Sequence, residues 1–328
     1  MRYFKNNYKN MLMPTMFLTI LGVTIYTFPV LFNSYDLLNI ESLLAFLLII
    51  SIFIPVYEYR VIKNKRGADL YYSLPLNRKH LNLQIFLKGL IEIITSTVLV
   101  MILTTLIYLT KEYNINYLYL ILFYLTAILS LISLYSFNVF IFKEANNIID
   151  GIIFIGIYLL ICMQFVYSLD ILFSFNTKLN FIQFSPLNLL FGNRSYFISK
   201  ITKEEPALLI GFMDLFMYLF WTLLSIGLGV VSIVYTKNNK PELVLEKSSS
   251  YLGYITLIPV IIFSLSVIVV GLSGRDSFIA VMIIGFLGYV LNVIYERSFK
   301  VNWINMVIIL GVLIAATILS YSINYIYR

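Results

Sequence analysis

The feature that most constrains this chain is a succession of apolar runs, each about as long as a helix that crosses a bilayer. A spanning helix needs about 20 apolar residues. The sequence contains nine such runs, at Met11–Phe32, Leu43–Tyr59, Leu83–Thr110, Tyr117–Phe142, Gly151–Phe175, Ala207–Tyr235, Tyr251–Leu272, Phe278–Tyr295 and Trp303–Tyr325. Their connections are too short to fold alone, and only 12% of the 328 residues are charged, about half the share in a globular domain. The sequence therefore predicts an all-α, polytopic integral membrane protein with one membrane domain.

Lysine and arginine predict the orientation of these spans. Cytoplasmic loops retain these residues, and 16 of the 23 fall on the side of the N-terminus if the spans alternate in direction. We therefore expect a multi-pass protein of the plasma membrane with a cytoplasmic N-terminus. No single basic face carries these cations, which argues against binding of nucleic acid.

Two segments outside the spans have a distinctive pattern. Residues 1–10 place three cations among aromatic side chains, which predicts an interfacial helix on the membrane surface. No small-residue cleavage site follows the first apolar run, so we expect that run to be a retained helix and not a signal peptide. Phe181–Gly192 is apolar, too short to span and interrupted by Pro186, which predicts a re-entrant or interfacial segment between spans five and six.

The sequence lacks the common catalytic and cofactor motifs. There is no GxxxxGK[ST] phosphate-binding loop. His80 is the single histidine and Cys162 the single cysteine, which excludes HExxH and CxxC sites and a His-based triad. Glu92 and Asp214 are the candidates for an intramembrane acid pair, but the predicted topology puts them toward opposite sides. We therefore expect a chain that is not an enzyme and has no cofactor or metal site of its own.

Charged residues within spans are candidates for the transport pathway, because burying them in the membrane is costly. Lys88 and Glu92 are four residues apart in span three and share a helix face. They either line a pathway or neutralise each other. Asp214 in span six either lines a wet vestibule or pairs with the outer loop.

The connection between spans two and three has an unusual pattern. Asp69 can cap or begin a short helical turn, Leu70, Tyr71 and Leu74 then share one face, and Pro75 ends it. The sequence therefore predicts a short helix across the inner membrane face, with an apolar and aromatic side. The alternative is an ordinary basic loop, for which neither the aromatic patch nor the proline is needed.

This helix has a basic rim and leads into span three. Arg66 and Arg78 lie at its two ends, and Asn77 can cap the helix that continues into the next span. Residues 66–78 read RGADLYYSLPLNR. They resemble the D-x-x-x-S-L-P-x-x-R element in permease subunits of ABC-2-type (type V-like) exporters of Gram-positive bacteria.

The resemblance implies an architecture and a set of partners. In that class the segment is the coupling helix that docks into a separate ATPase subunit, which binds the ATP and magnesium. It implies an interfacial helix at 1–10 and a six-helix permease core at 11–235. The chain departs from the class after span six, where residues 236–328 add two to three transmembrane helices. A second permease subunit, identical or related, completes the pathway. The cargo would be hydrophobic or amphipathic: cytolytic peptides of the phenol-soluble modulin kind, antimicrobial peptides, drugs or lipids.

Two other functions fit the same composition. A secondary transporter would show repeated halves with buried ions near the midplane. A scaffold or sensor subunit would transport nothing. Co-purification of an ATPase distinguishes both from an ATP-driven exporter.

Overall fold

The computed structural model consists of helices joined by short connections. It describes residues 11–32, 40–72, 77–110, 115–173, 181–192, 194–202, 212–234, 251–273, 278–296, 298 and 303–326. These residues form helices and turns and contain no strand, which confirms the all-α prediction. Because a helix satisfies its backbone hydrogen bonds internally, it suits a chain that must cross hydrocarbon. The predicted interfacial helix at 1–10 lies outside the described residues.

Eight of the described helices are long and apolar enough to cross a membrane. They correspond to the first eight predicted spans. The ninth corresponds to α14 (Trp303–Ile326), in which Trp303–Leu319 is the described apolar stretch. The chain is therefore a multi-pass membrane protein by the length and composition of its helices.

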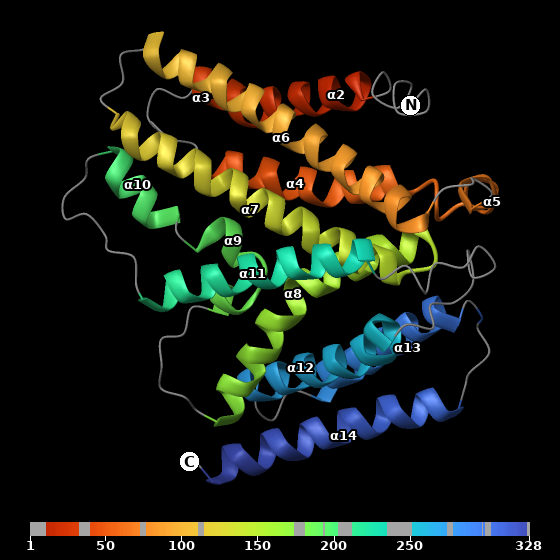
Figure 1. The fold of residues 1–328 in the computed structure, drawn as a ribbon. Coiled ribbons are helices and arrows are strands. Elements are labelled where there is room, and N and C mark those ends of the chain that lie inside the picture. Colours follow the sequence, from red (N-terminus) through yellow and green to blue (C-terminus); the bar gives the residue numbers. More distant parts are fainter. Residues whose placement is uncertain are drawn as a thin grey trace. The chain divides into compact units, whose positions relative to one another are not determined.

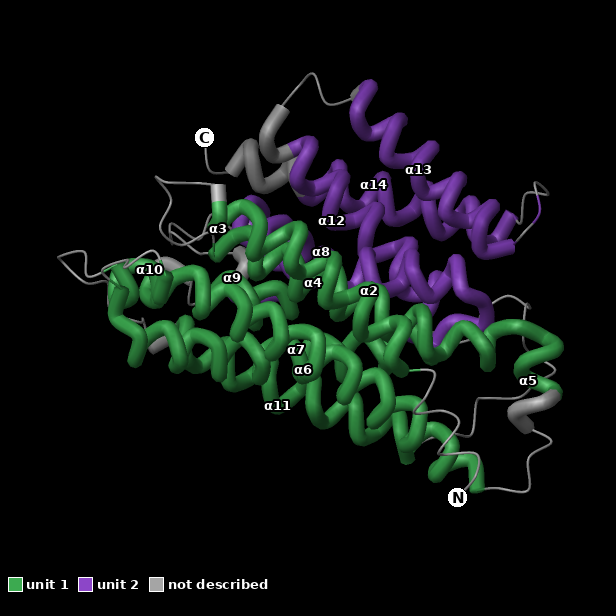
Figure 2. Tube along the Cα trace, turned by 90° about the horizontal axis from the view of Figure 1, so that it is seen from above, with its two compact units in different colours: residues 1–143, 186–241 green, residues 144–185, 242–328 purple. Residues whose placement is uncertain are grey.

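The helices fall into two compact units, drawn in green and purple in Figure 2. Unit 1 comprises residues 1–143 and 186–241, and unit 2 comprises residues 144–185 and 242–328. This grouping differs from the predicted division into 11–235 and 236–328, because the fifth span packs with the C-terminal helices. The functional meaning of the predicted division stays a prediction.

Unit 1 is a bundle in which long helices pack side by side (Figure 1). Its helices are α2 (Leu12–Gly22), η1 (Val23–Thr27), α3 (Phe28–Phe32), α4 (Ile40–Tyr59), α5 (Lys65–Tyr72), α6 (Arg78–Thr110), α7 (Tyr117–Glu144), α9 (Asn188–Phe191), α10 (Arg194–Thr202) and α11 (Phe212–Val234). α6 packs against α2, α4 and α11. Buried polar side chains join these helices: the Thr27 and Thr104 hydroxyls are 3.2 Å apart, and Asn138 Nδ2 donates to the Ser51 carbonyl at 2.8 Å.

The two ends of unit 1 differ. α4 and α7 finish, and α6 begins, at the end that carries α5, which we call the α5 end. α10 lies at the opposite end, where the Asn116 amide at the start of α7 donates to the Ile201 carbonyl at 3.0 Å. The span order of the sequence prediction agrees with this alternation of helix directions.

Unit 2 is built around α12 (Thr256–Ser273). This helix packs against α8 (Ile148–Phe173), α13 (Phe278–Glu296) and α14, and η4 (Tyr251–Ile255) leads into it. Leu172, Val267 and Ala316 form its buried apolar centre, one from each of α8, α12 and α14. The C-terminal end of α8 thus packs into this apolar centre.

The predicted re-entrant segment is broken, as expected, and contains no spanning helix. A 3-10 turn, η2 (Phe181–Phe184), packs on α8 in unit 2, and α9 packs on α4 and α11 in unit 1. Ser185, Asn188, Leu189 and Leu190 are buried, so protein covers this irregular backbone.

Candidate functional site

The short helix α5 is the element on which the functional prediction depends. It begins at Lys65, so the expected start at Asp69 is wrong: Asp69 lies within the helix and is exposed. The reason is that Asn64 precedes the helix, and the Ala68 amide donates to the Asn64 carbonyl at 2.7 Å, which closes the first turn. Asparagine is favoured in the position before a helix.

The helical stretch contains Arg66, Leu70 and Tyr71, while Leu74 and Pro75 lie outside the described residues. Arg66 and Arg78 are exposed, in keeping with a charged rim. The side chains of Leu70 and Tyr71 are also outside the described set, so the predicted apolar docking face stays a prediction.

The turn that precedes α5 is tight. Val61 and Gly67 lie so close that a Cβ atom at position 67 would be 2.2 Å from the Val61 carbonyl oxygen. Only glycine fits this approach without displacing backbone. Ala68 beside it is fully buried. α5 is therefore held in a defined position against the turn at residues 60–64.

Two lysines tie this turn to other helices. The Lys63 ammonium, on a side chain that is largely buried, donates to the Lys143 carbonyl at 3.0 Å. The Lys143 ammonium in turn donates to the Ser232 carbonyl near the end of α11. Cations are favourable at helix C-termini, where carbonyl groups lack helical partners. We call this chain of contacts the lysine relay; it joins the α5 turn to α7 and α11.

After α5 the chain leads into α6, and α6 begins with the predicted cap, Asn77. Asn77 Oδ1 accepts a hydrogen bond from the Lys79 amide at 3.1 Å, and the Leu81 amide donates to the Asn77 carbonyl at 3.1 Å. The prediction that Asn77 caps the third span is confirmed.

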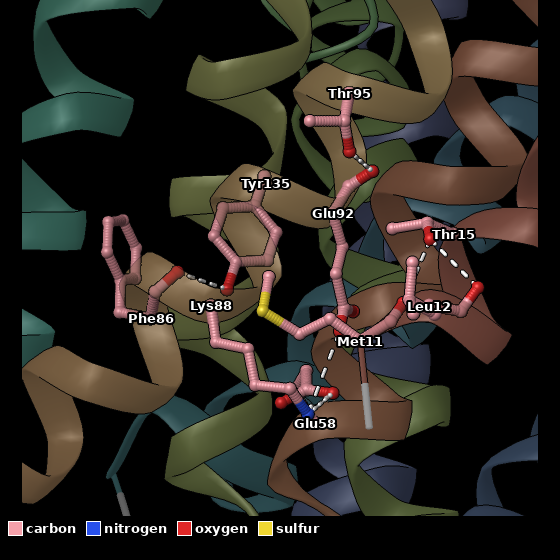
Figure 3. Close-up of polar contacts among 9 residues, drawn as sticks. All are labelled: Met11, Leu12, Thr15, Glu58, Phe86, Lys88, Glu92, Thr95 and Tyr135. Carbon is pink, nitrogen blue, oxygen red and sulfur yellow. Dashed lines mark hydrogen bonds and ion pairs between the residues drawn. The ribbon is translucent and has the colours of Figure 1, made fainter. Parts of the chain in front are cut away.

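About three helical turns after this cap, an ion cluster joins α6 to α4 (Figure 3). Lys88 Nζ lies 2.8 Å from Glu58 Oε1 and 3.7 Å from Glu92 Oε1. Glu92 is fully buried and Glu58 nearly so, whereas the Lys88 side chain is 18% exposed. The predicted Lys88–Glu92 contact exists, but the shorter contact is with Glu58, which sequence reasoning missed.

The cluster holds two carboxylates and one ammonium in a buried place. The nearby Tyr135 hydroxyl donates to the Phe86 carbonyl at 3.0 Å, which ties α7 to α6 beside the cluster (Figure 3). The Glu92 carboxylate oxygens make no hydrogen bond within the part of the chain that the structure describes. Lys88 is the cation that approaches this carboxylate, at 3.7 Å.

Asp214 is in the first turn of α11, and its side chain is partly exposed. The residues before Phe212, where the predicted span began at Ala207, lie outside the described set. A carboxylate in the first turn is favoured by the helix dipole. Asp214 and Ser232 lie at opposite ends of α11. The structure therefore does not bring Asp214 to the Glu58–Lys88–Glu92 cluster.

In the described parts of the chain no group of three or more His, Cys, Asp and Glu residues lies together as a metal site would. In comparisons with known proteins, no protein-family model, no curated protein and no solved structure matches the chain.

Proposed function

We propose that this chain is the transmembrane permease subunit of an ATP-driven exporter and works with a separate ATPase subunit. The observation that supports it best is α5 itself, a short helix between two spans. The segments that precede and follow α5 are both held by polar contacts. The lysine relay joins the turn before α5 to α7 and α11. The Lys88–Glu58 ion pair joins α6, which follows α5, to α4, which precedes it.

The same contacts suggest how a push on α5 reaches the membrane. α4 and α6 flank α5 in sequence and are clamped by Lys88 and Glu58, while Lys63 and Lys143 extend the connection to α7 and α11. A displacement of α5 by ATPase closure is therefore transmitted to four spans of unit 1. Packed elements with two discrete arrangements carry such coupling.

The remaining parts of the proposal rest on the sequence. The N-terminus and α5 face the cytoplasm in the plasma membrane, and a second permease subunit completes the pathway. The cargo is a hydrophobic or amphipathic molecule that leaves the cell: a cytolytic or antimicrobial peptide, a drug or a lipid.

The test truncates the predicted docking face. The full chain carrying Leu70→Ala, Tyr71→Ala and Leu74→Ala together is purified, and retained ATPase and cargo-stimulated hydrolysis are measured. Burying one such side chain is worth about 1.5–3 kcal/mol, so the triple variant should lose at least tenfold in ATPase affinity. Unchanged binding and stimulation in a variant that inserts normally would remove α5 as the coupling helix.

A matched control removes three large apolar side chains elsewhere. Leu118, Ile121 and Leu125 are exposed on α7, and their combined replacement by alanine should leave ATPase binding unchanged.

A secondary transporter is the second candidate, and one observation favours it. Glu92 is a fully buried carboxylate inside a span, and such residues mark ion pathways in transporters. If transport by the purified chain in vesicles persists without any ATPase and responds to an ion gradient, this second function replaces the first.

A further inference from the structure

Unit 1 carries an exposed row of aromatic side chains that ends at an arginine. The Phe17 and Phe53 rings lie 6.0 Å apart between centroids, and Phe53 stacks on Tyr57 at 5.9 Å. The guanidinium carbon of Arg60 lies 4.1 Å from the centroid of the Tyr57 ring. We call these four residues the aromatic stripe. Phe17 is 54% exposed and Phe53 is 39% exposed, so the stripe lies on the outside of unit 1.

The stripe follows one face of α4 from the end of that helix toward the middle of the membrane. Ile49, Phe53 and Tyr57 are spaced by four residues and therefore share a face, and Arg60 directly follows the last residue of α4. The rise from Ile49 to Arg60 is about 16 Å. Half of the hydrocarbon core of a bilayer is about 15 Å thick. This face thus has the length of an acyl chain in one leaflet.

α2 supplies a second row of apolar side chains beside the first. Met13, Phe17 and Ile20 are exposed and are spaced by four and three residues, so they share a face of α2. The contact between Phe17 and Phe53 joins the two rows. An acyl chain on this surface is therefore contacted by side chains of two helices.

The arginine at the end of the stripe offers donors to an anion. Its contact with Tyr57 occupies a face of the guanidinium plane and leaves the N–H groups at the edge of that plane, which match the oxygens of a phosphate. Among the described residues, no carboxylate forms an ion pair with Arg60. The nearby Glu58 carboxylate is buried and lies 2.8 Å from Lys88 Nζ. Arg60 is thus available to an anion from outside the protein.

The charges around Arg60 favour an anionic head group over a zwitterionic one. α5 packs on the turn that begins at Arg60, and this helix has two exposed cations, Lys65 and Arg66, and one acid, Asp69. Cations near a membrane surface attract acidic lipids. The same cations repel the ammonium group of a zwitterionic head.

We propose that the aromatic stripe binds an anionic phospholipid of the leaflet at the α5 end. The lipid phosphate pairs with the Arg60 guanidinium, and one acyl chain lies along Tyr57, Phe53 and Phe17. The other occupant of an apolar face in a membrane is a second copy of the chain, which the experiment distinguishes. The site requires only the spanning helices of unit 1 and does not depend on export.

Quenching of a tryptophan placed in the stripe measures which lipid occupies it. Phe53→Trp is combined with Trp221→Phe and Trp303→Phe in the full chain, which removes the two native tryptophans. The protein is reconstituted in phosphatidylcholine vesicles that contain brominated phosphatidylglycerol or, in parallel, brominated phosphatidylcholine. We expect phosphatidylglycerol to quench with about fivefold higher apparent affinity, the effect of one cation on an acidic lipid. Equal quenching by the two lipids would overturn the proposal.

Two variants test whether the arginine selects the lipid. Arg60→Gln should remove the preference for phosphatidylglycerol. Lys79→Gln removes another exposed cation at the α5 end and should keep it. An equal loss in both variants would refute the site, because any basic surface would then attract the lipid. A tryptophan at position 53 that neither lipid quenches would also refute it, because protein would then cover the stripe.

A second measurement leaves the tryptophans and Phe53 unchanged. The full chain and its Arg60→Gln variant are released from detergent in a mass spectrometer after incubation with equal amounts of phosphatidylglycerol and phosphatidylcholine. The unmodified chain should retain phosphatidylglycerol preferentially, and the variant should not. Equal retention of phosphatidylglycerol by both proteins would refute the site, and the ATPase tests of the proposed function would be unaffected.

Discussion

Replacing Lys88 with methionine should destabilise unit 1 strongly. Methionine keeps much of the length and apolar character of the side chain but leaves Glu58 and Glu92 without their shared cation. With an effective dielectric constant of about 20, the attraction is about 6 kcal/mol at the 2.8 Å contact and about 4.5 kcal/mol at the 3.7 Å contact. Desolvation offsets much of this, and loss of one partner from a buried pair costs about 3–5 kcal/mol.

The expected result is therefore a loss of about 3–5 kcal/mol in the free energy of unfolding for Lys88→Met. Adding Glu58→Gln and Glu92→Gln to it should restore most of that loss, because the uncompensated charges are removed. Glu92→Gln alone should change the free energy of unfolding only slightly, because Lys88 keeps its closer partner Glu58.

Unfolding can be followed by titrating SDS into mixed micelles and recording tryptophan fluorescence. The chain has two tryptophans: Trp221 is buried in unit 1, beside Phe137 at 6.4 Å between ring centroids, and Trp303 is 80% exposed in unit 2. A Trp303→Phe background makes the signal specific to unit 1. If Lys88→Met unfolds within 1 kcal/mol of its parent, or if the two glutamine changes give no rescue, the cluster does not have the compensating role assigned to it.

Three further outcomes follow from the sequence and the fold. In a Cys162→Ser background, an impermeant thiol reagent on intact cells should label a cysteine placed at Asn193 but not one at Asn77; labelling at 77 would reverse the orientation. Asp214→Asn should impair export more than expression; normal export with altered thermal stability would make Asp214 structural. Gly67→Ala should displace α5, because its Cβ meets the backbone of the preceding turn, and should lower ATPase retention while insertion is unchanged; normal retention would mean that the position of α5 is not critical.

The features predicted best from the sequence are those that depend on one helix alone. The apolar runs located the spans, and Asn77 located the start of α6, because length, hydropathy and capping are local properties. The start of α5 was predicted wrongly, because Asp69 was taken as its cap or first residue although the helix begins at Lys65. Asn64, directly before the helix, carried the same kind of local signal.

Contacts between helices could not be predicted in the same way. Lys88 and Glu92 are four residues apart and visibly share a face, whereas Glu58 is thirty residues away on another helix. The packing of α8 with α12 and α14 could not be predicted either. Helices that are apolar on all sides have no hydrophobic periodicity that indicates which helix they contact. Lys63 and Lys143 looked like ordinary positive-inside cations, and only their places near helix ends hinted at a structural role.

The most direct test of the central claim is a photocrosslink from α5 in the unmodified cellular setting. A photoreactive phenylalanine analogue replaces Tyr71 in the full chain, native membranes are irradiated, and crosslinked partners are identified after purification. The same analogue at Leu118, an exposed position at the start of α7, is the control. The exporter proposal predicts an ABC-type ATPase crosslinked at position 71 and not at 118. The absence of any ATPase among the partners at position 71, in membranes where the chain is inserted and active, would contradict it.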